Sequence, residues 1–244
     1  MDFQLMFESL PKLLEGTLVT LELVALSMVI GMALAIPIAL MRVSRFLWLK
    51  GPAYAYIFFF RGTPLLVQLF LVYYGISQFV AVRESVLWTV LREPYWCAIL
   101  AFTLNTAAYT GEILRGAIQA VPWGQIEAGL SVGMSRFQLL RRIVGPQAAR
   151  LALPGYSNEV ILLVKASSLA STVTLLELTG IARNIIAVTF MPIELFFLAA
   201  CIYLAMVIII SRIFMLIEYL VSAHMRAAKD TGKLEVGKVP TTFG

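Results

Sequence analysis

The sequence predicts an all-α integral membrane protein that crosses a bilayer five times. Hydrophobic residues make up 60% of the 244 residues, and the mean hydropathy of +0.88 is far above that of an ordinary soluble domain. Long apolar runs recur along the chain, each close to the length that a helix needs to cross the ~30 Å hydrocarbon core. Lys and Arg gather in alternate connections between these runs, which predicts how the chain is oriented in the membrane.

Five apolar runs supply the predicted spans. The four that contain no Asp, Glu, Lys or Arg are residues 23–41, 62–82, 94–111 and 195–211. A fifth run, residues 151–173, contains only Glu159 and Lys165 as charged residues. Residues 46–60 are rich in aromatic side chains and are expected to lie at the membrane surface. Residues 175–185 have the spacing of an amphipathic helix, which we expect on the outer surface.

The distribution of charge predicts the topology. Residues 42–61 carry four basic residues and no acid, whereas residues 1–16 carry one Lys and three acids. Residues 112–150 and the tail after Ser211 are also rich in Lys and Arg. This pattern predicts an N-terminus outside and a C-terminus in the cytoplasm. Because topology accounts for the net charge of +5, nucleic-acid binding is not expected.

One part of the chain is expected to be folded and the other to be partly disordered. Residues 1–222 form the predicted transmembrane domain. Residues 223–244 are short, mixed in charge and contain Gly and Pro. We therefore expect them to be a partly disordered cytoplasmic tail.

The chain lacks the residue patterns that carry out bond chemistry. Cys97 and Cys201 lie inside predicted spans and the single His224 lies in the tail, so neither a disulfide framework nor a metal site is expected. The spans contain no Ser/His, paired-Asp or HExxH constellation. No Gly-x4-Gly-Lys-Ser/Thr loop that would bind ATP is present. We therefore expect a protein that is not an enzyme and holds no cofactor.

Residues 122–150 form a basic, polar connection between two apolar runs. Glu127 near the start of a predicted helix complements the helix dipole. Gly133 is expected to let another backbone come close. An apolar face is predicted by three residues at i, i+4 and i+7, namely Leu130, Met134 and Phe137. Such a helix suits insertion into a groove on a soluble partner; the alternative is an interfacial loop that only caps the bundle.

The spacing in this connection resembles the EAA loop of the permease subunits of ATP-binding-cassette (ABC) importers. That loop reads EAA, three residues, Gly, nine residues and I-x-LP. Here Glu127-Ala128-Gly129 precedes Gly133 and then Ile143-x-Gly145-Pro146, so that Gly129 and Gly145 depart from the pattern. The resemblance implies a coupling helix that docks into a groove on an ATPase subunit. The residues implied in coupling are Glu127, Ala128, Gly129, Gly133, Met134 and Phe137.

Three further stretches are similar to the permeases for polar amino acids. They are FRGTPL at 60–65, LNTAAY at 104–109 and YSNEV at 156–160. The nearest subgroup moves histidine, lysine, arginine, ornithine and opines. The resemblance implies the type I ABC importer permease fold, with residues 1–222 as the permease domain. It also implies a permease subunit for polar, chiefly basic, amino acids or opines in the bacterial inner membrane.

The same resemblance implies the partners. Members of the family work with a dimer of ATP-binding subunits, a second permease subunit and a periplasmic solute-binding protein. The second permease is expected to be a different, homologous chain, and ATP is expected on the partner ATPase. The alternative function is an ion-gradient-driven secondary transporter of small polar solutes, which five spans without an internal repeat do not favour.

Ionisable residues inside the predicted spans are candidates for the solute pathway, because such residues usually face a bundle interior or water. Glu159 is the first candidate, since a carboxylate near the membrane centre suits a cationic group. Glu112 is the second, although it can also pair with Arg115 at i+3. The other candidates share faces of these two spans, namely Asn105, Asn158, Lys165 and Ser168. The alternative for all of them is structural pairing between helices or subunits.

Overall fold

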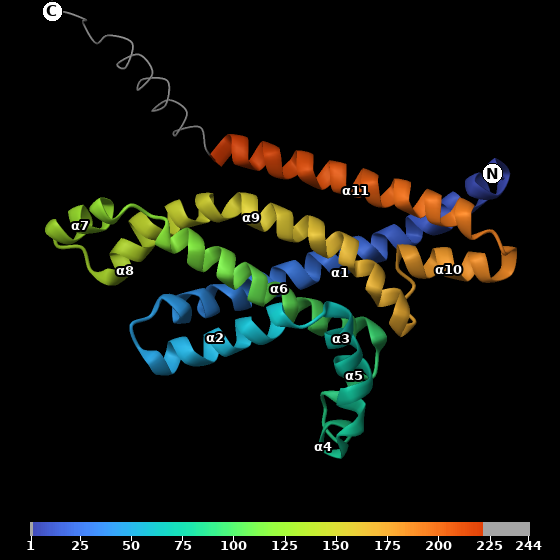
Figure 1. The fold of residues 1–244 in the computed structure, drawn as a ribbon, viewed down its shortest axis with the longest axis horizontal. Coiled ribbons are helices and arrows are strands. Elements are labelled where there is room, and N and C mark those ends of the chain that lie inside the picture. Colours follow the sequence, from blue (N-terminus) through green and yellow to red (C-terminus); the bar gives the residue numbers. More distant parts are fainter. Residues whose placement is uncertain (1, 222–244) are drawn as a thin grey trace, which may run out of the picture.

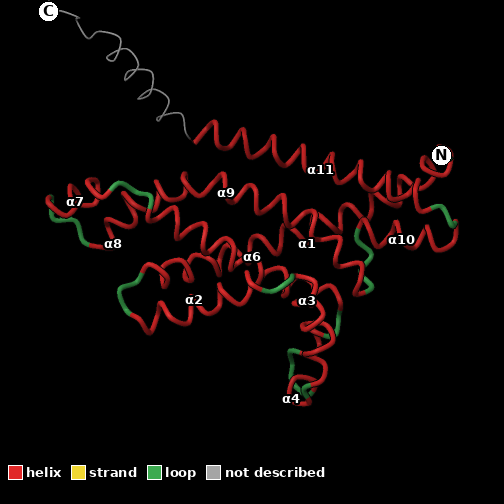
Figure 2. Tube along the Cα trace, viewed as in Figure 1, coloured by secondary structure: helices red, strands yellow, loops and turns green. Residues whose placement is uncertain are grey.

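The computed structural model describes residues 2–221, which form helices joined by short loops with no strand among them (Figure 2). Four long helices lie side by side and make up most of the body (Figure 1). They are α1 (Phe3–Val43), α6 (Pro94–Gln119), α9 (Gly145–Ala166) and α11 (Pro192–Val221). The predicted tail at residues 223–244, with His224, lies outside the described residues.

Shorter helices connect or flank these four. α2 (Leu47–Gly62) packs along α1 and α6, and α10 (Leu178–Thr189) packs on α1 and α11. The others are α3 (Leu65–Phe70), α4 (Val80–Arg83), α5 (Trp88–Leu91), α7 (Trp123–Ser131) and α8 (Arg136–Leu139). Leu71–Gly75 and Leu140–Val144 are π-helical, and Ile76–Gln78 and Ser167–Val173 are 3-10 helical.

Among the described residues, three helices are long and apolar enough to cross a membrane, namely α1, α6 and α11. Two bent pairs of helices also qualify, so that up to five spans result if each pair is one span. One pair joins α2 to Leu65–Gln78 with a bend of 105°, and the other joins Arg136–Val173 to α10 with a bend of 47°. The predicted five spans are the upper end of this range.

The second predicted span, residues 62–82, is not one straight helix. Leu65–Gln78 within it is helical, but it follows α2 after a bend of 105° at Thr63-Pro64, so the candidate span is a bent pair that begins earlier, at Leu47. Thr63 is extended, with φ −115° and ψ 144°, because the ring of a proline disfavours a helical conformation in the residue before it. The segment predicted at the membrane surface, residues 46–60, is mostly α2, whose Ala53 and Ile57 are buried where the helix packs on α1 and α6.

Small residues allow α1 and α6 to approach closely. Ala35 of α1 and Ala107 and Ala108 of α6 are fully buried. A Cβ atom on Gly31 would lie only 2.9 Å from Cγ2 of Thr106, which is closer than real contacts allow. In a membrane, where the hydrophobic effect does not drive helices together, such close packing stabilises their association.

The amphipathic helix predicted at residues 175–185 corresponds to α10, whose apolar face packs into the protein. Leu178 and Ala182 are fully buried, and the helix packs on α1 and α11. The predicted helical spacing is therefore correct in outline, and the helix covers the bundle with its apolar face. The apolar side of α10 belongs to the core of the protein.

Glu177 holds α10 in place and was not singled out in the sequence. Its side chain caps the helix by accepting hydrogen bonds from the backbone N–H groups of Thr179 and Gly180, each at 2.9 Å. The hydroxyl of Tyr203 on α11 donates a third hydrogen bond at 2.9 Å. This fully buried carboxylate thus links α10 to α11, and both of its oxygens accept hydrogen bonds.

Candidate solute cavity and coupling loop

A polar cavity of about 480 Å³ lies between the α2–α3 turn, α6 and α9. Its polar lining side chains are Arg61, Thr63, Asn105, Tyr109 and Glu159. The two charged groups come from segments that are about a hundred residues apart in the chain, so that only the fold brings them to one cavity. A cavity with an acid, a base and a few neutral polar groups suits a small polar solute.

Glu159 is the buried acid of this cavity. Its side chain belongs to α9 and the residue is only 7% exposed. Among the described residues, none forms a hydrogen bond or an ion pair with its carboxylate. A buried carboxylate without a partner is costly, so the arrangement leaves its charge to be satisfied by something that enters the cavity.

Arg61 supplies the opposite charge at the end of α2. Its guanidinium lies over the ring of Tyr109, with Cζ 5.1 Å from the ring centroid. A cation over an aromatic face is held by the quadrupole of the ring, which leaves the N–H groups of Arg61 free to face an anion. Arg61 and Glu159 therefore line the same cavity without a direct ion pair between them in the described structure.

Asn105 is buried beside the cavity and fixes the α2–α3 turn. Its amide donates to Oε1 of Gln68 at 2.9 Å and to the carbonyl of Phe60 at 3.3 Å. Gln68 in turn donates to the carbonyl of Phe60 at 2.9 Å and to Oγ1 of Thr63 at 2.7 Å. The backbone carbonyl of Phe60, which has no helical partner because the helix ends at the turn, thus accepts hydrogen bonds from two amide side chains. Gln68 was not predicted as a site residue, although an amide side chain inside an apolar run marks it in the sequence.

Glu112 lies outside this cavity, in an ion-pair cluster. Its Oε1 accepts a hydrogen bond from Nε of Arg115 at 2.7 Å, and its Oε2 lies 3.7 Å from Arg42 of α1. The guanidinium of Arg42 also lies 5.0 Å from the ring centroid of Tyr54 on α2. The pairing with Arg115, which the sequence left open as an alternative, is therefore present in the structure.

The remaining pathway candidates do not line the Glu159 cavity. Asn158 and Lys165 are exposed on α9. The hydroxyl of Ser168 donates to the carbonyl of Lys165 at 2.8 Å. Because α9 ends at Ala166 and the chain tightens to a 3-10 helix, Ser168 does not continue the helical face expected for it.

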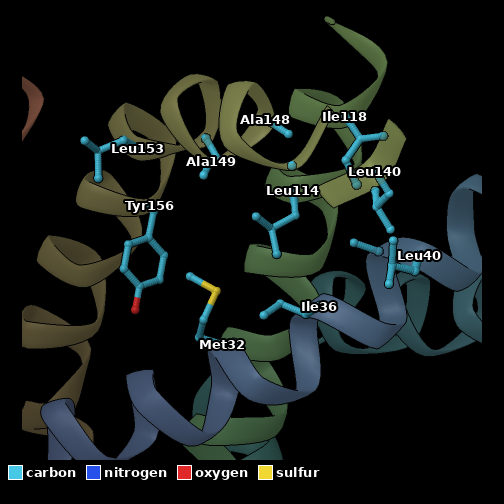
Figure 3. A pocket seen from close by; sticks show the side chains of 13 residues that line it. Met32, Ile36, Leu40, Leu114, Ile118, Leu140, Ala148, Ala149, Leu153 and Tyr156 are labelled. Atoms are coloured by element: carbon cyan, nitrogen blue, oxygen red, sulfur yellow. The ribbon is translucent and has the colours of Figure 1, made fainter. Parts of the chain in front are cut away.

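A second cavity, of about 490 Å³, has a different character. Its lining comes from α1, α6, the π-helical turn and α9 and is almost wholly apolar, as Figure 3 shows with Met32, Leu114 and Leu153. Tyr156 brings the hydroxyl seen there. Apolar walls offer nothing to replace the hydration of a charged solute. The polar cavity at Glu159 is therefore the better candidate for the solute.

The predicted coupling loop, residues 122–150, has a shorter first helix and a sharper bend than its sequence spacing predicted. α7 begins after Pro122 and ends at Ser131, and Gly133 has φ +79°. Because glycine enters this left-handed region without steric cost, Gly133 is needed to turn the chain. A Cβ there would meet no atom of the described chain within 4 Å, so no other segment of this chain makes the predicted close approach.

That turn also removes the predicted continuous apolar face. Leu130 lies in α7, whereas Met134 follows the turn and Phe137 lies in α8. Close packing is required instead at Gly129, where a Cβ would lie 2.7 Å from Cδ1 of Leu139 and 2.9 Å from Cδ1 of Ile143. The small residue at this position therefore lets α7 fold back onto the segment that follows it.

The opposite side of the loop is open. Glu127 and Ala128 are exposed, and Oε1 of Glu127 accepts a hydrogen bond from the indole of Trp123 at 2.8 Å. Large exposed apolar side chains of the loop are Trp123, Leu130, Val132 and Phe137. An exposed apolar patch with a fixed carboxylate is typical of a protein-binding surface.

Comparison with known proteins places these features in a family. The family model described as "Binding-protein-dependent transport system inner membrane component" matches residues 27–225. The nopaline transport system permease protein NocM of Agrobacterium fabrum is 53% identical over 228 residues, which cover 93% of this chain and 95% of the relative. The histidine/lysine/arginine/ornithine transport system permease protein HisM of Escherichia coli K12 is 44% identical over 200 residues, covering 82% and 84% of the two chains.

A solved structure supports the same family. The crystal structure of an amino acid ABC transporter with histidines contains a chain that superposes on this one with a TM-score of 0.80 at 35% sequence identity. The match covers 89% of this chain and 98% of the other. Both the sequence and the helical arrangement thus agree over nearly the whole length.

Proposed function

The chain belongs to the family of binding-protein-dependent transport system inner membrane components, and we propose that it moves basic amino acids or opines. It is the permease subunit of an ABC importer, a pore component whose ATPase is a separate subunit. The observation that carries the proposed solute class is the 53% identity to a nopaline permease over nearly the full length of both chains. An ion-gradient-driven secondary transporter, the alternative, lacks any such relative among these matches.

The cavity at Glu159 is the proposed solute site of this subunit. A basic amino acid carries at least one cationic group and one carboxylate. Glu159 is placed to receive a cationic group, and Arg61 to receive a carboxylate. Because the two residues do not pair with each other in the described structure, solute binding need not break an existing ion pair.

Asn105 and Tyr109 have supporting roles in this proposal. Asn105 holds the α2–α3 turn that carries Arg61, through its contacts with Gln68 and Phe60. Tyr109 orients the guanidinium of Arg61 from α6. Lys165, Asn158 and Ser168 lie outside the cavity of this subunit, and we assign them to contacts elsewhere in the transporter.

The proposed topology has five spans, with the N-terminus outside and the coupling loop in the cytoplasm. Each bent helix pair then counts as one span. The basic residues around the α1–α2 connection, Arg42, Arg45 and Lys50, and the basic excess at 112–150 support this orientation. The protein is accordingly proposed to be a multi-pass component of the bacterial inner membrane.

The proposed partners follow from the two sites. The exposed face of α7, with Glu127, docks on a dimer of ATP-binding subunits, and a second, homologous permease completes the pore. A periplasmic solute-binding protein delivers the solute. ATP binding closes the ATPase dimer, moves α7 and shifts the helices between inward- and outward-facing states, because each partner prefers one state.

Reconstitution tests this function. The chain, purified with its ATPase and second permease, is placed in proteoliposomes with the binding protein, and uptake of radiolabelled arginine is measured with and without internal ATP. We expect ATP-dependent uptake that unlabelled nopaline or lysine reduces and that glutamate does not. Uptake by the chain alone, driven by an ion gradient, would contradict the proposal and support the secondary transporter.

A further inference from the structure

Residues 71–93 form an arm that projects from the helical body (Figure 1). The arm continues α3, passes through α4 at its tip and returns through α5 to the start of α6 at Pro94. It consists of short helical pieces joined by turns (Figure 2). None of its residues is buried, so the arm has no core of its own.

The exposed side chains of the arm are largely apolar. Val86 at the tip is 86% exposed, and Phe79 and Leu87 are each more than 60% exposed. Further exposed apolar residues are Leu71, Tyr74, Val80 and Val90. Four-residue helices such as α4 and α5 are not stable by themselves in water. A contiguous apolar surface of this kind therefore requires a covering phase or partner.

The direction of the arm indicates what covers it. Leu65–Gln78 leaves α2 with a bend of 105°, so that the arm lies across the long helices rather than along them (Figure 1). It joins α6, a candidate membrane span, at the first residue of that helix. In this bent pair α2 is the part that runs along the neighbouring spans, so a continuation at about a right angle to α2 runs close to the plane of the membrane.

The composition of the arm agrees with this placement. Tyr74 and Trp88 are residues of the type that gather at the boundary between headgroups and acyl chains. The charges are balanced, with Arg83 and Arg92 against Glu84 and Glu93. Arg92 and Glu93 form an ion pair at 3.5 Å. A neutral arm suits zwitterionic headgroups, since no excess of positive charge is available for anionic lipid.

We propose that residues 71–93 form an in-plane membrane anchor at the headgroup interface beside the N-terminal end of α6. The exposed side chains at Phe79, Val86 and Leu87 enter the boundary of the acyl chains, and the ion-paired Arg92 remains among the headgroups. The bilayer is thus the covering phase that the arm lacks within the chain. The anchor fixes the level of α3 and α6, and hence of the turn that carries Arg61.

Spin labels measure the depth of the arm directly. The complete transporter, with Cys97→Ser and Cys201→Ala in this chain, is placed in phosphatidylcholine nanodiscs. Nitroxide labels are attached in separate samples at Val86→Cys and Leu87→Cys. Gln4→Cys is the reference for water, and Ile209→Cys on α11 is the reference for hydrocarbon. Collision rates with oxygen and with a water-soluble nickel chelate are then recorded, and retained ATPase activity confirms assembly of each variant.

The anchor predicts labels about 5–10 Å within the headgroup and acyl boundary. Collisions with nickel at Val86→Cys and Leu87→Cys should be several-fold fewer than at Gln4→Cys, with oxygen collisions between the two references. Nickel collisions equal to those at Gln4→Cys would overturn the proposal in favour of an arm in water. Low collisions with both reagents would show that protein covers the arm, and a depth equal to that of Ile209→Cys would show a re-entrant loop; either result also overturns it. The measurement needs no transported solute, so its outcome is independent of the proposed solute class.

Discussion

Two buried carboxylates of this chain, Glu159 and Glu177, have opposite surroundings. Glu177 is fully buried and receives hydrogen bonds from two backbone N–H groups, from Tyr203 and, at 3.5 Å, from Thr20. Glu159 is almost as deeply buried but lines a cavity, and no described residue satisfies it. Since buried charges need partners, the carboxylate of Glu177 is satisfied within the chain, whereas that of Glu159 is proposed to be satisfied by the solute.

The comparison separates a structural acid from a functional one without reference to sequence position. Glu177 joins α1, α10 and α11, so its removal should lower the stability of the folded protein. Glu159 makes no hydrogen bond or ion pair among the described residues, so its removal should reduce transport and leave stability unchanged. The same substitution at the two positions should therefore give opposite results.

Glu159→Gln has the largest expected effect. It keeps the size of the side chain and removes the charge proposed to face a cationic solute. A hydrogen bond to a charged group is worth roughly 1.5–3 kcal/mol, so uptake of arginine should fall about ten- to hundredfold. The initial rate of ATP-dependent uptake in proteoliposomes measures this loss. Thermal stability in detergent should not fall, because no neighbour loses a bond, and unchanged uptake would show that the bare carboxylate does not face the solute.

Glu127→Lys extends the comparison to a carboxylate on the surface. Reversing the charge on the exposed face of α7 should uncouple ATP hydrolysis from uptake, because this face is proposed to dock on the ATPase. The number of ATP molecules hydrolysed per solute molecule taken up should rise several-fold while membrane insertion stays normal. Glu84→Lys, an exposed acid far from the loop, is the control and should leave that ratio unchanged. Normal coupling in Glu127→Lys would remove this residue from the mechanism.

Glu177→Gln should destabilise the protein rather than stop transport. The new amide group cannot accept, so one set of buried donors loses its partner at a cost of about 2 kcal/mol. This corresponds to a melting temperature lower by roughly 5 °C for a chain of this size. The temperature at which half of the monodisperse transporter is lost in detergent measures the change. Full stability together with lost uptake would reverse the assignment of the two acids.

Tyr203→Phe should give the smallest effect and sharpens the account of Glu177. The variant removes one of the donors to that carboxylate and leaves the ring in place. A single neutral donor contributes about 1 kcal/mol, so the loss should be about half of that in Glu177→Gln. Tyr74→Phe, an exposed tyrosine, should have no measurable effect in the same thermal assay. Equal losses in both tyrosine variants would argue against the hydrogen bond as the cause.

The two acids also differ in how visible they are in the sequence. Glu159 was identified because it interrupts an apolar run, where a charge is costly and therefore informative. Glu177 follows the end of that run and looks like an ordinary loop acid at the start of a helix. Its burial depends on Thr20 and Tyr203, which are distant in the chain, and no local pattern contains that information.

In the predicted coupling loop, too, the sequence identified some features and only the structure distinguished others. The spacing of Glu127, Gly129 and Gly133 was sufficient to identify the family, and the family model confirms it. The local geometry differed from the expectation, because Gly133 turns the chain whereas Gly129 is the point of close packing. Both are glycines in the sequence, and only the backbone angle of one and the neighbours of the other distinguish their roles.

The sequence by itself determined that the chain is helical and apolar enough for a membrane, and that it is a permease of ABC importers. Those properties depend on hydropathy and motif spacing, which are local along the chain. Only the tertiary structure decided that the chain turns by 105° after α2, that Arg61 and Glu159 share a cavity, and that Asn158 and Lys165 do not line it. A helical spacing places residues on a common face, but the packing of other helices decides what that face meets.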